Sequence, residues 1–298
     1  MDALVSQLRS DEDPWVAPPP YADRARVEIR NVGKGFGEDH ERTQVVQNLT
    51  LTLEPGQLTA LVGPSGCGKS CIVSLVAGYE RPDSGSILLN GQPVKGAGHD
   101  RMVVFQETAL FPWLTTYQNI VFGPRLRGGI KGVDLKHEAD RLLRRVGLTE
   151  FRDKYPSQLS GGMQRRAELA RAMINHPLVM IMDEPFRGLD AMTRELMQEF
   201  FLRLFEENRR TNLFVTSEIE EAIILADKLV VLSALPATVR AEIHIALPRP
   251  RNFRMLSSSE AYAYKQQALE ILHEEAMKSF GRKRNSDFIE AFSKRGGH

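Results

Sequence analysis

Hydrophobic and polar residues alternate in two segments near the start of the chain, Val27–Val32 and Val45–Leu53. A period of two residues predicts β-strands with one face packed inward and the other toward water. A third predicted strand, Ser86–Leu89, precedes Asn90-Gly91, a pair typical of a β-hairpin turn. These segments predict an antiparallel β portion of the fold.

Short apolar segments then alternate with segments of helical period. Helices are predicted over Lys69–Ala77, which stops at Gly78, over Asp190–Arg209 and over Ser217–Ala226. The further predicted strands are Leu58–Val62, Met102–Phe105, Leu178–Met182, Leu213–Thr216 and Leu229–Ser233. Alternation of helices with buried strands predicts an α/β fold with a mainly parallel sheet.

Residues 115–175 interrupt that alternation with a helical pattern, which ends near Gly147 and resumes after it. We therefore expect a helical subdomain, at about residues 110–175, inserted in the α/β core. The core domain is predicted over residues 27–250. A flexible, acidic and proline-rich leader (1–26) precedes it, and a helical, basic extension (251–298) follows, with its helix at about 260–280.

The composition excludes several classes of protein. The 298 residues carry a net charge of only +1, whereas a general nucleic-acid-binding protein needs a basic surface, so we expect no nucleic-acid partner. No apolar segment approaches the roughly 20 residues of a membrane span, and the acidic N-terminus is unlike a secretion signal. The two cysteines, Cys67 and Cys71, exclude a disulfide framework and favour the reducing cytosol.

A glycine-rich loop lies between a predicted strand and a predicted helix. Gly63-Pro64-Ser65-Gly66-Cys67-Gly68-Lys69-Ser70 fits the phosphate-loop pattern G-x-x-x-x-G-K-[ST]. Glycines let successive N–H groups point at phosphate oxygens, and the helix N-terminus adds partial positive charge. Lys69 can bridge the terminal phosphates, and Ser70 can ligate Mg²⁺. The alternative, a plain glycine-rich turn, is disfavoured by the strand–helix context.

Two further segments carry related chemistry. The apolar strand Leu178–Met182 leads to Asp183, which can hold Mg²⁺ through water, and to Glu184, which can polarise an attacking water. Two surface acids after a core strand are the alternative interpretation. Residues 159–164, Leu-Ser-Gly-Gly-Met-Gln, begin a helix and form either a second anion site or a simple N-terminal cap.

Together these motifs resemble those of ATP-binding cassette (ABC) ATPases, over roughly residues 27–250. The Walker A loop (63–70), Gln106, the signature (159–164) and Walker B (178–184) stand in the family order. The resemblance implies an α/β fold: a P-loop NTPase core (RecA-like, mainly parallel sheet) with an antiparallel β subdomain and an inserted helical signature subdomain. It also implies ATP and Mg²⁺ as cofactors, ATP hydrolysis as the activity, and a head-to-tail dimer with two ATP sites.

The resemblance assigns a role to each matching position. Catalytic roles fall on Glu184, Lys69, Gln106 and the switch position, Ser217. ATP would be bound in cis by Phe36, Gly63, Pro64, Ser65, Gly66, Cys67, Gly68, Lys69, Ser70 and Cys71, with Phe36 stacking on adenine unless it is a core residue. The partner's ATP would be contacted in trans by Ser160, Gly161, Gly162 and Gln164, beside Asp190 of the D-loop. Mg²⁺ would be held by Ser70, Gln106 and Asp183.

A single cassette without a fused membrane span is typical of bacterial importers. The stretch from Phe105-Gln106-Glu107 to Phe122-Gly123 and the segment Ala246–Arg251 resemble the nitrate, sulfonate and taurine branch. The implied partners are integral-membrane permease subunits, a second cassette (homodimer or heterodimer), and a periplasmic or lipid-anchored substrate-binding protein. Phe111–Thr115 would contact the permease unless it is a core segment. The implied location is peripheral, on the cytoplasmic face of the bacterial inner membrane; the alternative function is a non-transport regulatory cassette.

Several positions depart from the family pattern. Ser217 stands where the family has a histidine, and its short hydroxyl side chain predicts normal ATP binding with slow hydrolysis, unless Glu184 suffices. Cys71 replaces the usual threonine, and Arg187 lies where small residues are usual, so it makes a charge contact across the dimer or is simply exposed. Cys67 lies near Lys69 and a helix N-terminus, which predicts a thiol of lowered pKa whose alkylation blocks ATP binding.

Overall fold

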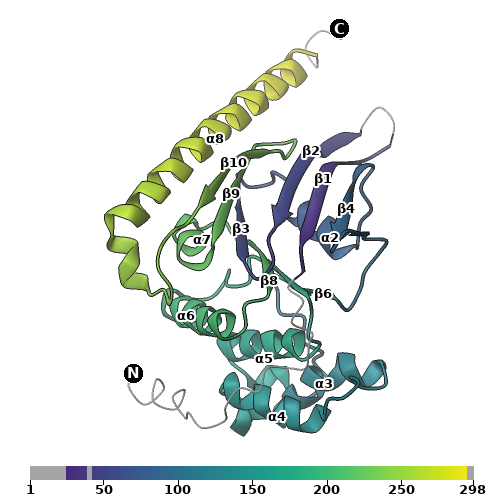
Figure 1. Cartoon of the computed structure of the whole chain (residues 1–298). Coiled ribbons are helices and arrows are strands. Elements are labelled where there is room, and N and C mark those ends of the chain that lie inside the picture. Colours follow the sequence, from purple (N-terminus) through teal and green to yellow (C-terminus); the bar gives the residue numbers. More distant parts are fainter. Residues whose placement is uncertain (1–24, 39–41, 294–298) are drawn as a thin grey trace. The chain divides into compact units, whose positions relative to one another are not determined.

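A computed structural model describes residues 25–38 and 42–293 of the chain, with side chains described as far as Lys278 (Figure 1). The chain divides into two compact units. We name them the loop unit, residues 26–97 and 212 onward, and the helical unit, residues 98–211. The predicted leader lies outside the described residues apart from Ala25 and Arg26.

The loop unit begins with an antiparallel sheet of strand order β2-β1-β4-β5. The buried Ile29 of β1 lies opposite Leu51 on one side and Ile87 on the other, so apolar cross-strand pairs hold one face of the sheet. The antiparallel portion predicted from the alternating pattern is therefore confirmed. Its strands are β1 (Val27–Phe36), β2 (Thr43–Leu53), β4 (Ser84–Leu89) and β5 (Gln92–Pro93).

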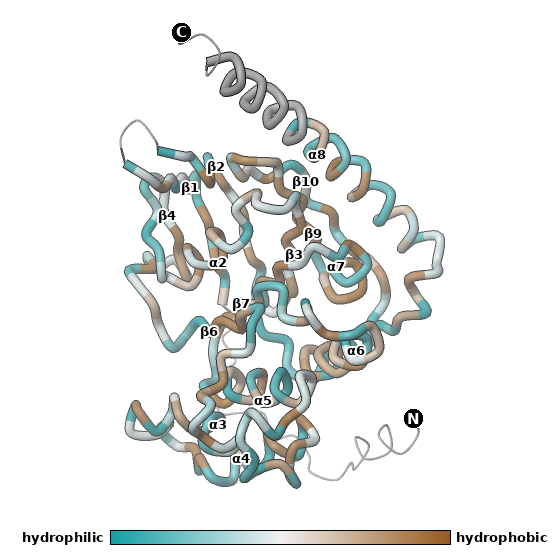
Figure 2. The backbone as a smooth tube through the Cα atoms, turned by 180° about the vertical axis from the view of Figure 1, so that it is seen from behind, coloured by the Kyte–Doolittle hydropathy of each residue, from teal (hydrophilic) through white to brown (hydrophobic). Residues whose placement is uncertain are grey.

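A second sheet of the loop unit is mainly parallel. Strand β3 (Leu58–Val62) lies between β8 (Thr211–Val215) and β9 (Lys228–Leu232) and is parallel to both. Every residue of the three strands is buried, as is typical of parallel strands covered on both faces, and Figure 2 shows β9 and α7 as mainly hydrophobic. The edge strand β10 (Val239–His244), which the sequence pattern did not predict, pairs antiparallel with β9.

Helices follow these strands, as the alternation predicted. Helix α2 (Lys69–Ala77) follows β3 and ends at Gly78, whose φ of 80° is the left-handed conformation that glycine adopts without strain. Helix α7 (Ile219–Leu225) follows β8 but begins two residues later than predicted, because Glu218 is its N-cap. Ser217 therefore lies in the turn before the helix.

The helical unit contains the parallel strands β6 (Arg101–Val104) and β7 (Val179–Asp183), with helices between and after them. Each of its long helices is preceded by an N-cap residue whose side chain accepts a hydrogen bond from a backbone N–H group. These residues are Thr115, Asp134, Ser160 and Asp190. The helical character predicted for residues 115–175 is confirmed. The helices are α3 (Thr116–Leu126), α4 (Leu135–Arg145), α5 (Gly161–Met173) and α6 (Ala191–Glu207), with short 3₁₀ turns η2 (Thr149–Phe151) and η3 (Pro156–Gln158).

The C-terminal segment of the loop unit consists of a 3₁₀ turn, η4 (Phe253–Ser257), and helix α8 (Ser259–Ser293). Helix α8 is longer than the helix predicted at about 260–280, and it packs against α7 (Figure 1). Among the described residues, no helix combines the length and apolar character that crossing a membrane requires.

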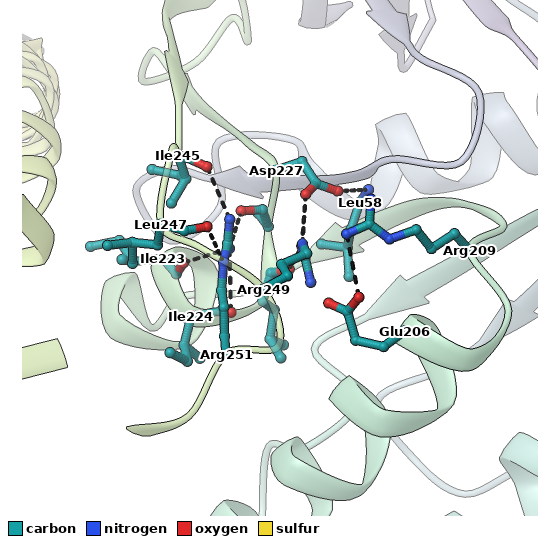
Figure 3. Close-up of polar contacts among 12 residues, drawn as sticks. Leu58, Glu206, Arg209, Ile223, Ile224, Asp227, Ile245, Leu247, Arg249 and Arg251 are labelled. Atoms are coloured by element: carbon teal, nitrogen blue, oxygen red, sulfur yellow. Dashed lines mark hydrogen bonds and ion pairs between the residues drawn. The ribbon is translucent and has the colours of Figure 1, made fainter. Parts of the chain in front are cut away.

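A buried arginine, Arg251, helps to fasten the segment before α8 to the loop unit, as does the neighbouring Arg249, which pairs with Asp227. The guanidinium of Arg251 donates hydrogen bonds to five backbone carbonyls around it (Figure 3). The carbonyls belong to Ile223, Ile224, Ala226, Ile245 and Leu247. The first three lie at the end of α7, where helix carbonyls lack partners within the helix and carry partial negative charge, so a buried cation is favourable there.

Replacing Arg251 by methionine is expected to lower the free energy of unfolding by about 3 kcal/mol, because buried carbonyls lose a charged donor. Urea denaturation followed by circular dichroism measures the change. Arg254→Met is the matched control, because Arg254 is exposed in the same segment and should change stability by less than about 0.5 kcal/mol. Equal stability of the two variants would contradict the fastening role of Arg251.

Candidate functional site

The glycine-rich loop connects β3 to α2, as predicted. Gly66 and Gly68 have φ values of 74° and 106°, so both positions require the left-handed conformation that favours glycine. Gly68 is the N-cap of α2, and the helix has neither a side-chain cap nor an acidic residue in its first turn. The N–H groups and the positive end of this helix are therefore available to an anion.

Lys69 folds back over the loop that precedes it. Its Nζ donates to the carbonyl oxygens of Gly63 and Pro64 at 2.9 and 3.2 Å, and the residue is only 8% exposed. These bonds hold the ammonium group directly at the loop, while Ser70 at the start of α2 is exposed. A phosphate in the loop would meet a cation that is already in place.

Cys67 is not an activated thiol, contrary to the expectation from the sequence. Burial raises the pKa of Cys67, and this effect outweighs the opposing influence of Lys69. Burial likewise raises the pKa of Cys71 to about 11. The sequence suggested a lowered pKa for Cys67 because Lys69 is near it along the chain. Proximity along the chain carries no information about burial, and Cys67 is only 1% exposed.

Native Cys71 is expected to react with Ellman's reagent at pH 8 about 100-fold more slowly than in unfolded protein. The thiolate is the reacting form, and a pKa of about 11 in place of 9.0 removes most of it. Stopped-flow absorbance of Cys67→Ser, with and without urea, measures the two rates. The Cys71→Ser variant reports Cys67, which should also react slowly. Equal native and unfolded rates would contradict the burial effect.

Phe36 and Ser217 also belong to the loop unit. Phe36 ends β1 and is 43% exposed, so a face of its ring can stack, and the Nζ of Lys34 lies 5.2 Å from the ring centroid. A fully buried core phenylalanine is thereby excluded. Ser217 is exposed in the turn after β8, and its neighbour Thr216 accepts a hydrogen bond from the N–H of Glu218. The turn therefore presents a short hydroxyl side chain at the predicted switch position.

In the helical unit, β7 delivers the two predicted acids. Asp183 is the last residue of the strand and is half-buried. Glu184 follows with a φ of 45°, an uncommon value for a residue other than glycine, and is only 8% exposed. The strand end thus fixes two adjacent carboxylates in different surroundings, one more accessible and one enclosed.

Gln106 lies in an exposed segment whose backbone is held by a buried ion pair that the sequence analysis missed. Arg165 and Glu168 of α5 pair at 2.6 Å, and Arg165 donates to the carbonyls of Phe105 and Gln106. Glu168 accepts from the N–H of Ala109 at 3.2 Å, and burial raises the pKa of its carboxyl group. The i, i+3 spacing of opposite charges on a helix that is otherwise largely buried is the signal that could have revealed this clamp.

The signature residues lie at the start of α5. The Oγ of Ser160 accepts a hydrogen bond from the N–H of Met163 at 3.3 Å, and its hydroxyl proton remains a potential donor. A Cβ on Gly162 would come within 2.9 Å of Thr193, so this glycine permits close packing of α6, whereas Gly161 is exposed. Ser160 with the exposed helix start can therefore receive an anion.

Gln164, also part of the signature, makes several hydrogen bonds within its own unit. Its amide donates to the carbonyls of Pro156 and Leu159 and accepts from the hydroxyl of Thr108. Asp190 is the N-cap of α6, accepting from the N–H of Thr193 at 3.0 Å, and hydrogen bonding with Thr193 lowers the pKa of its carboxyl group. Both residues therefore shape the segments that carry the other candidates.

The segment Phe111–Thr115 is divided between packing and exposure. The ring of Phe111 lies 4.6 Å from that of Phe122 and 5.5 Å from that of Trp113, measured between centroids. Trp113 itself is 69% exposed. An exposed aromatic ring that packs on a neighbouring ring is typical of a protein-binding surface.

The candidates thus form two sets. The loop unit carries residues 63–71, Phe36 and Ser217, and the helical unit carries Gln106, the signature, Asp183, Glu184 and Asp190. The first set is suited to holding phosphate groups. The second set provides two acids, an amide and a second anion-binding helix start.

Comparison with known proteins agrees with these features. The family described as ABC transporter matches residues 46–187. The taurine import ATP-binding protein of Roseobacter denitrificans is 42% identical over 74% of this chain and 82% of its own length. The nitrate import ATP-binding protein of Synechococcus elongatus is 39% identical over 81% of this chain and 89% of its own length. The bicarbonate transport ATP-binding protein of the same organism is 37% identical over 90% of this chain and 97% of its own length.

Solved structures show the same fold. The dimeric, post-hydrolysis structure of the ATP-binding cassette MJ0796 with ADP and Pi superposes with a TM-score of 0.63 at 25% identity, covering 74% of this chain and all of that one. Another dimeric structure of this cassette has the same TM-score at 26% identity. With the phosphate loop, signature and acidic strand end all present, the chain belongs to the ABC transporter family as one of its ATP-binding proteins, and it is an ATPase.

Proposed function

We propose that this ATPase drives uptake of a small solute, of the nitrate, taurine or bicarbonate kind, through a separate permease. The observation that carries the proposal is the similarity to import and transport ATP-binding proteins over 82–97% of their own lengths.

The candidate residues of the loop unit and of the helical unit have different roles in the proposed hydrolysis of ATP. The loop from Gly63 to Cys71 cradles the phosphates, Lys69 neutralises the terminal ones, and Phe36 stacks on the adenine. Gln106 orients the water and the metal, and Glu184 polarises the attacking water. The uncapped start of α2 and the ammonium group already held at the loop support this assignment.

The donor set fits Mg²⁺. Ser70, Gln106 and Asp183 offer hydroxyl, amide and carboxylate oxygens, the ligand type that this ion prefers. No cluster of three or more acidic, histidine or cysteine side chains suited to a metal occurs among the described residues. Mg²⁺ is generally held by one or two protein oxygens together with substrate phosphates, so such a cluster is not needed. The bound ion would neutralise charge on the phosphates.

The proposed partners follow from the same family. A second cassette, identical or related, would place its signature on the ATP bound by the loop of this chain. Ser160 and Gly161 of this chain would likewise contact the ATP bound by the second cassette. Permease subunits would cover Phe111–Thr115, where Trp113 is exposed. A substrate-binding protein, periplasmic or lipid-anchored, would complete the system, and the cassette would lie on the cytoplasmic face of the inner membrane. The relatives' names favour transport over a purely regulatory cassette.

Reconstitution tests the proposal. The chain is co-expressed with the permease encoded nearest to it and purified through a tag on the permease. We expect co-purification and MgATP hydrolysis, and we expect co-purification to be lost when Trp113 is replaced by alanine in the docking segment. Labelled nitrate, taurine and bicarbonate are then offered to vesicles carrying the complex and its binding protein. Absence of binding to any permease and of uptake would contradict the importer assignment.

Substituting histidine for Ser217 is expected to raise the ATPase rate about tenfold, because it restores a long donor at the switch position. Initial rates of phosphate release in the reconstituted complex measure the change. Ser257→His, which changes another exposed serine of the loop unit, is the control. An unchanged rate in S217H would show that Glu184 suffices.

A further inference from the structure

Glu184 and Arg187 form an ion pair within the turn that follows β7. The Nη1 of Arg187 donates to the Oε2 of Glu184 at 2.7 Å, and the N–H of Arg187 donates to the Glu184 carbonyl at 3.1 Å. The Glu184 side chain is 9% exposed, whereas that of Arg187 is 60% exposed. One side chain is thus enclosed and the other covers it from the solvent side.

The backbone of the turn sets up this pairing. Glu184 has a φ of 45° and Gly188 a φ of 81°, and both are in the left-handed region. Between them Phe186 is 1% exposed and packs against Phe201, with ring centroids 6.2 Å apart. The buried phenylalanine anchors the turn, so the arginine that follows it returns toward the glutamate.

The pair bears directly on the chemistry assigned to Glu184. A carboxylate that polarises water must offer that water an oxygen in the correct orientation. A guanidinium on Oε2 occupies acceptor positions of that oxygen and fixes the side chain in one arrangement. Because Arg187 is largely exposed, the pair is weak and can be broken when the surroundings change.

We propose that Arg187 is a positioning residue that latches the Glu184 carboxylate and thereby slows ATP hydrolysis. The latch rests on the proposed role of Glu184. The latch is a contact within one chain, and the charge contact of Arg187 across a dimer stays a separate prediction. Together with the short side chain at Ser217, the latch favours slow hydrolysis.

Three substitutions test the latch in the purified protein. Arg187→Ala and Arg187→Gln remove the cation, and Arg187→Lys keeps it. An exposed ion pair contributes up to about 1 kcal/mol, so the first two should raise kcat about two- to fivefold with an unchanged KM for ATP. Arg187→Lys should stay near the wild-type rate. A change of turn structure alone would make the lysine and glutamine variants behave alike.

The matched control is the Arg209–Glu206 pair, which has the same i, i+3 spacing at 3.3 Å in the same unit (Figure 3). Arg209→Ala should leave kcat unchanged. Equal or lower kcat in both Arg187→Ala and Arg187→Gln would overturn the latch, and circular dichroism identifies a variant that fails to fold. Binding of a fluorescent ATP analogue separates the two proposals. If the wild-type protein binds ATP but the variants show no increase in kcat, only the latch is refuted. If the wild-type protein binds no ATP, the proposed function is refuted as well.

Discussion

Replacing Lys69 by alanine is expected to raise the Kd for ATP roughly 10- to 100-fold, because one charge-assisted contact contributes about 1.5–3 kcal/mol. Hydrolysis should fall by about 10²–10³-fold, since positive charge at the terminal phosphates is lost. Lys69 is the cation already held at the loop, 2.9 Å from the Gly63 carbonyl oxygen. Titration with a fluorescent ATP analogue and phosphate release measure the two effects.

Two controls accompany this substitution. Lys95→Ala removes an exposed cation from the same unit and should leave the Kd unchanged. Lys69→Arg keeps the charge but places a planar fork where a compact ammonium group was held, so it should not restore wild-type affinity. Unchanged ATP binding in Lys69→Ala would mean that the glycine-rich loop is not the phosphate site.

Replacing Glu184 by glutamine is expected to lower kcat about 10²–10⁴-fold while ATP still binds, because the amide keeps the shape but cannot act as a base. Since hydrolysis reopens the proposed dimer, the variant should accumulate as an ATP-bound dimer. Light scattering behind a sizing column, with and without MgATP, measures the dimer, and phosphate release measures kcat.

The control for this experiment addresses the ion pair that the substitution also removes. Glu206→Gln breaks the equivalent pair with Arg209 and should leave kcat and the oligomeric state unchanged. A Glu184→Gln protein that still hydrolyses ATP at the wild-type rate would assign the attacking water to another residue.

Much of the fold was predictable because periodicity reports which faces are buried. The limits of α2 and the stop at Gly78 agree with the structure, since local signals define them: a glycine-rich loop before the helix and a glycine after it. Strand β10 was missed because its short alternating pattern owes its pairing to β9, a neighbour that a local window does not contain.

The candidate site was predictable to the level of motifs but not of contacts. Residues 63–70 and Asp183 to Glu184 lie where the pattern predicted, at the ends of buried strands. The spacing did not predict the bonds that the Gln164 amide makes with Pro156, Leu159 and Thr108, and its contact with nucleotide across a dimer stays a prediction. Sequence spacing identifies a residue's neighbours along the helix but not the partners that its side chain takes.

The sequence by itself determined the layered α/β architecture, the phosphate loop and the acidic strand end, because these depend on short, contiguous patterns of apolar residues and glycines. Only the tertiary structure decided the state of the side chains. Burial reversed the expected direction of the Cys67 pKa, five carbonyls from separate segments surround Arg251, and the turn after β7 sets Arg187 against Glu184. Desolvation and ion pairing depend on distances in space, which residue order alone does not specify.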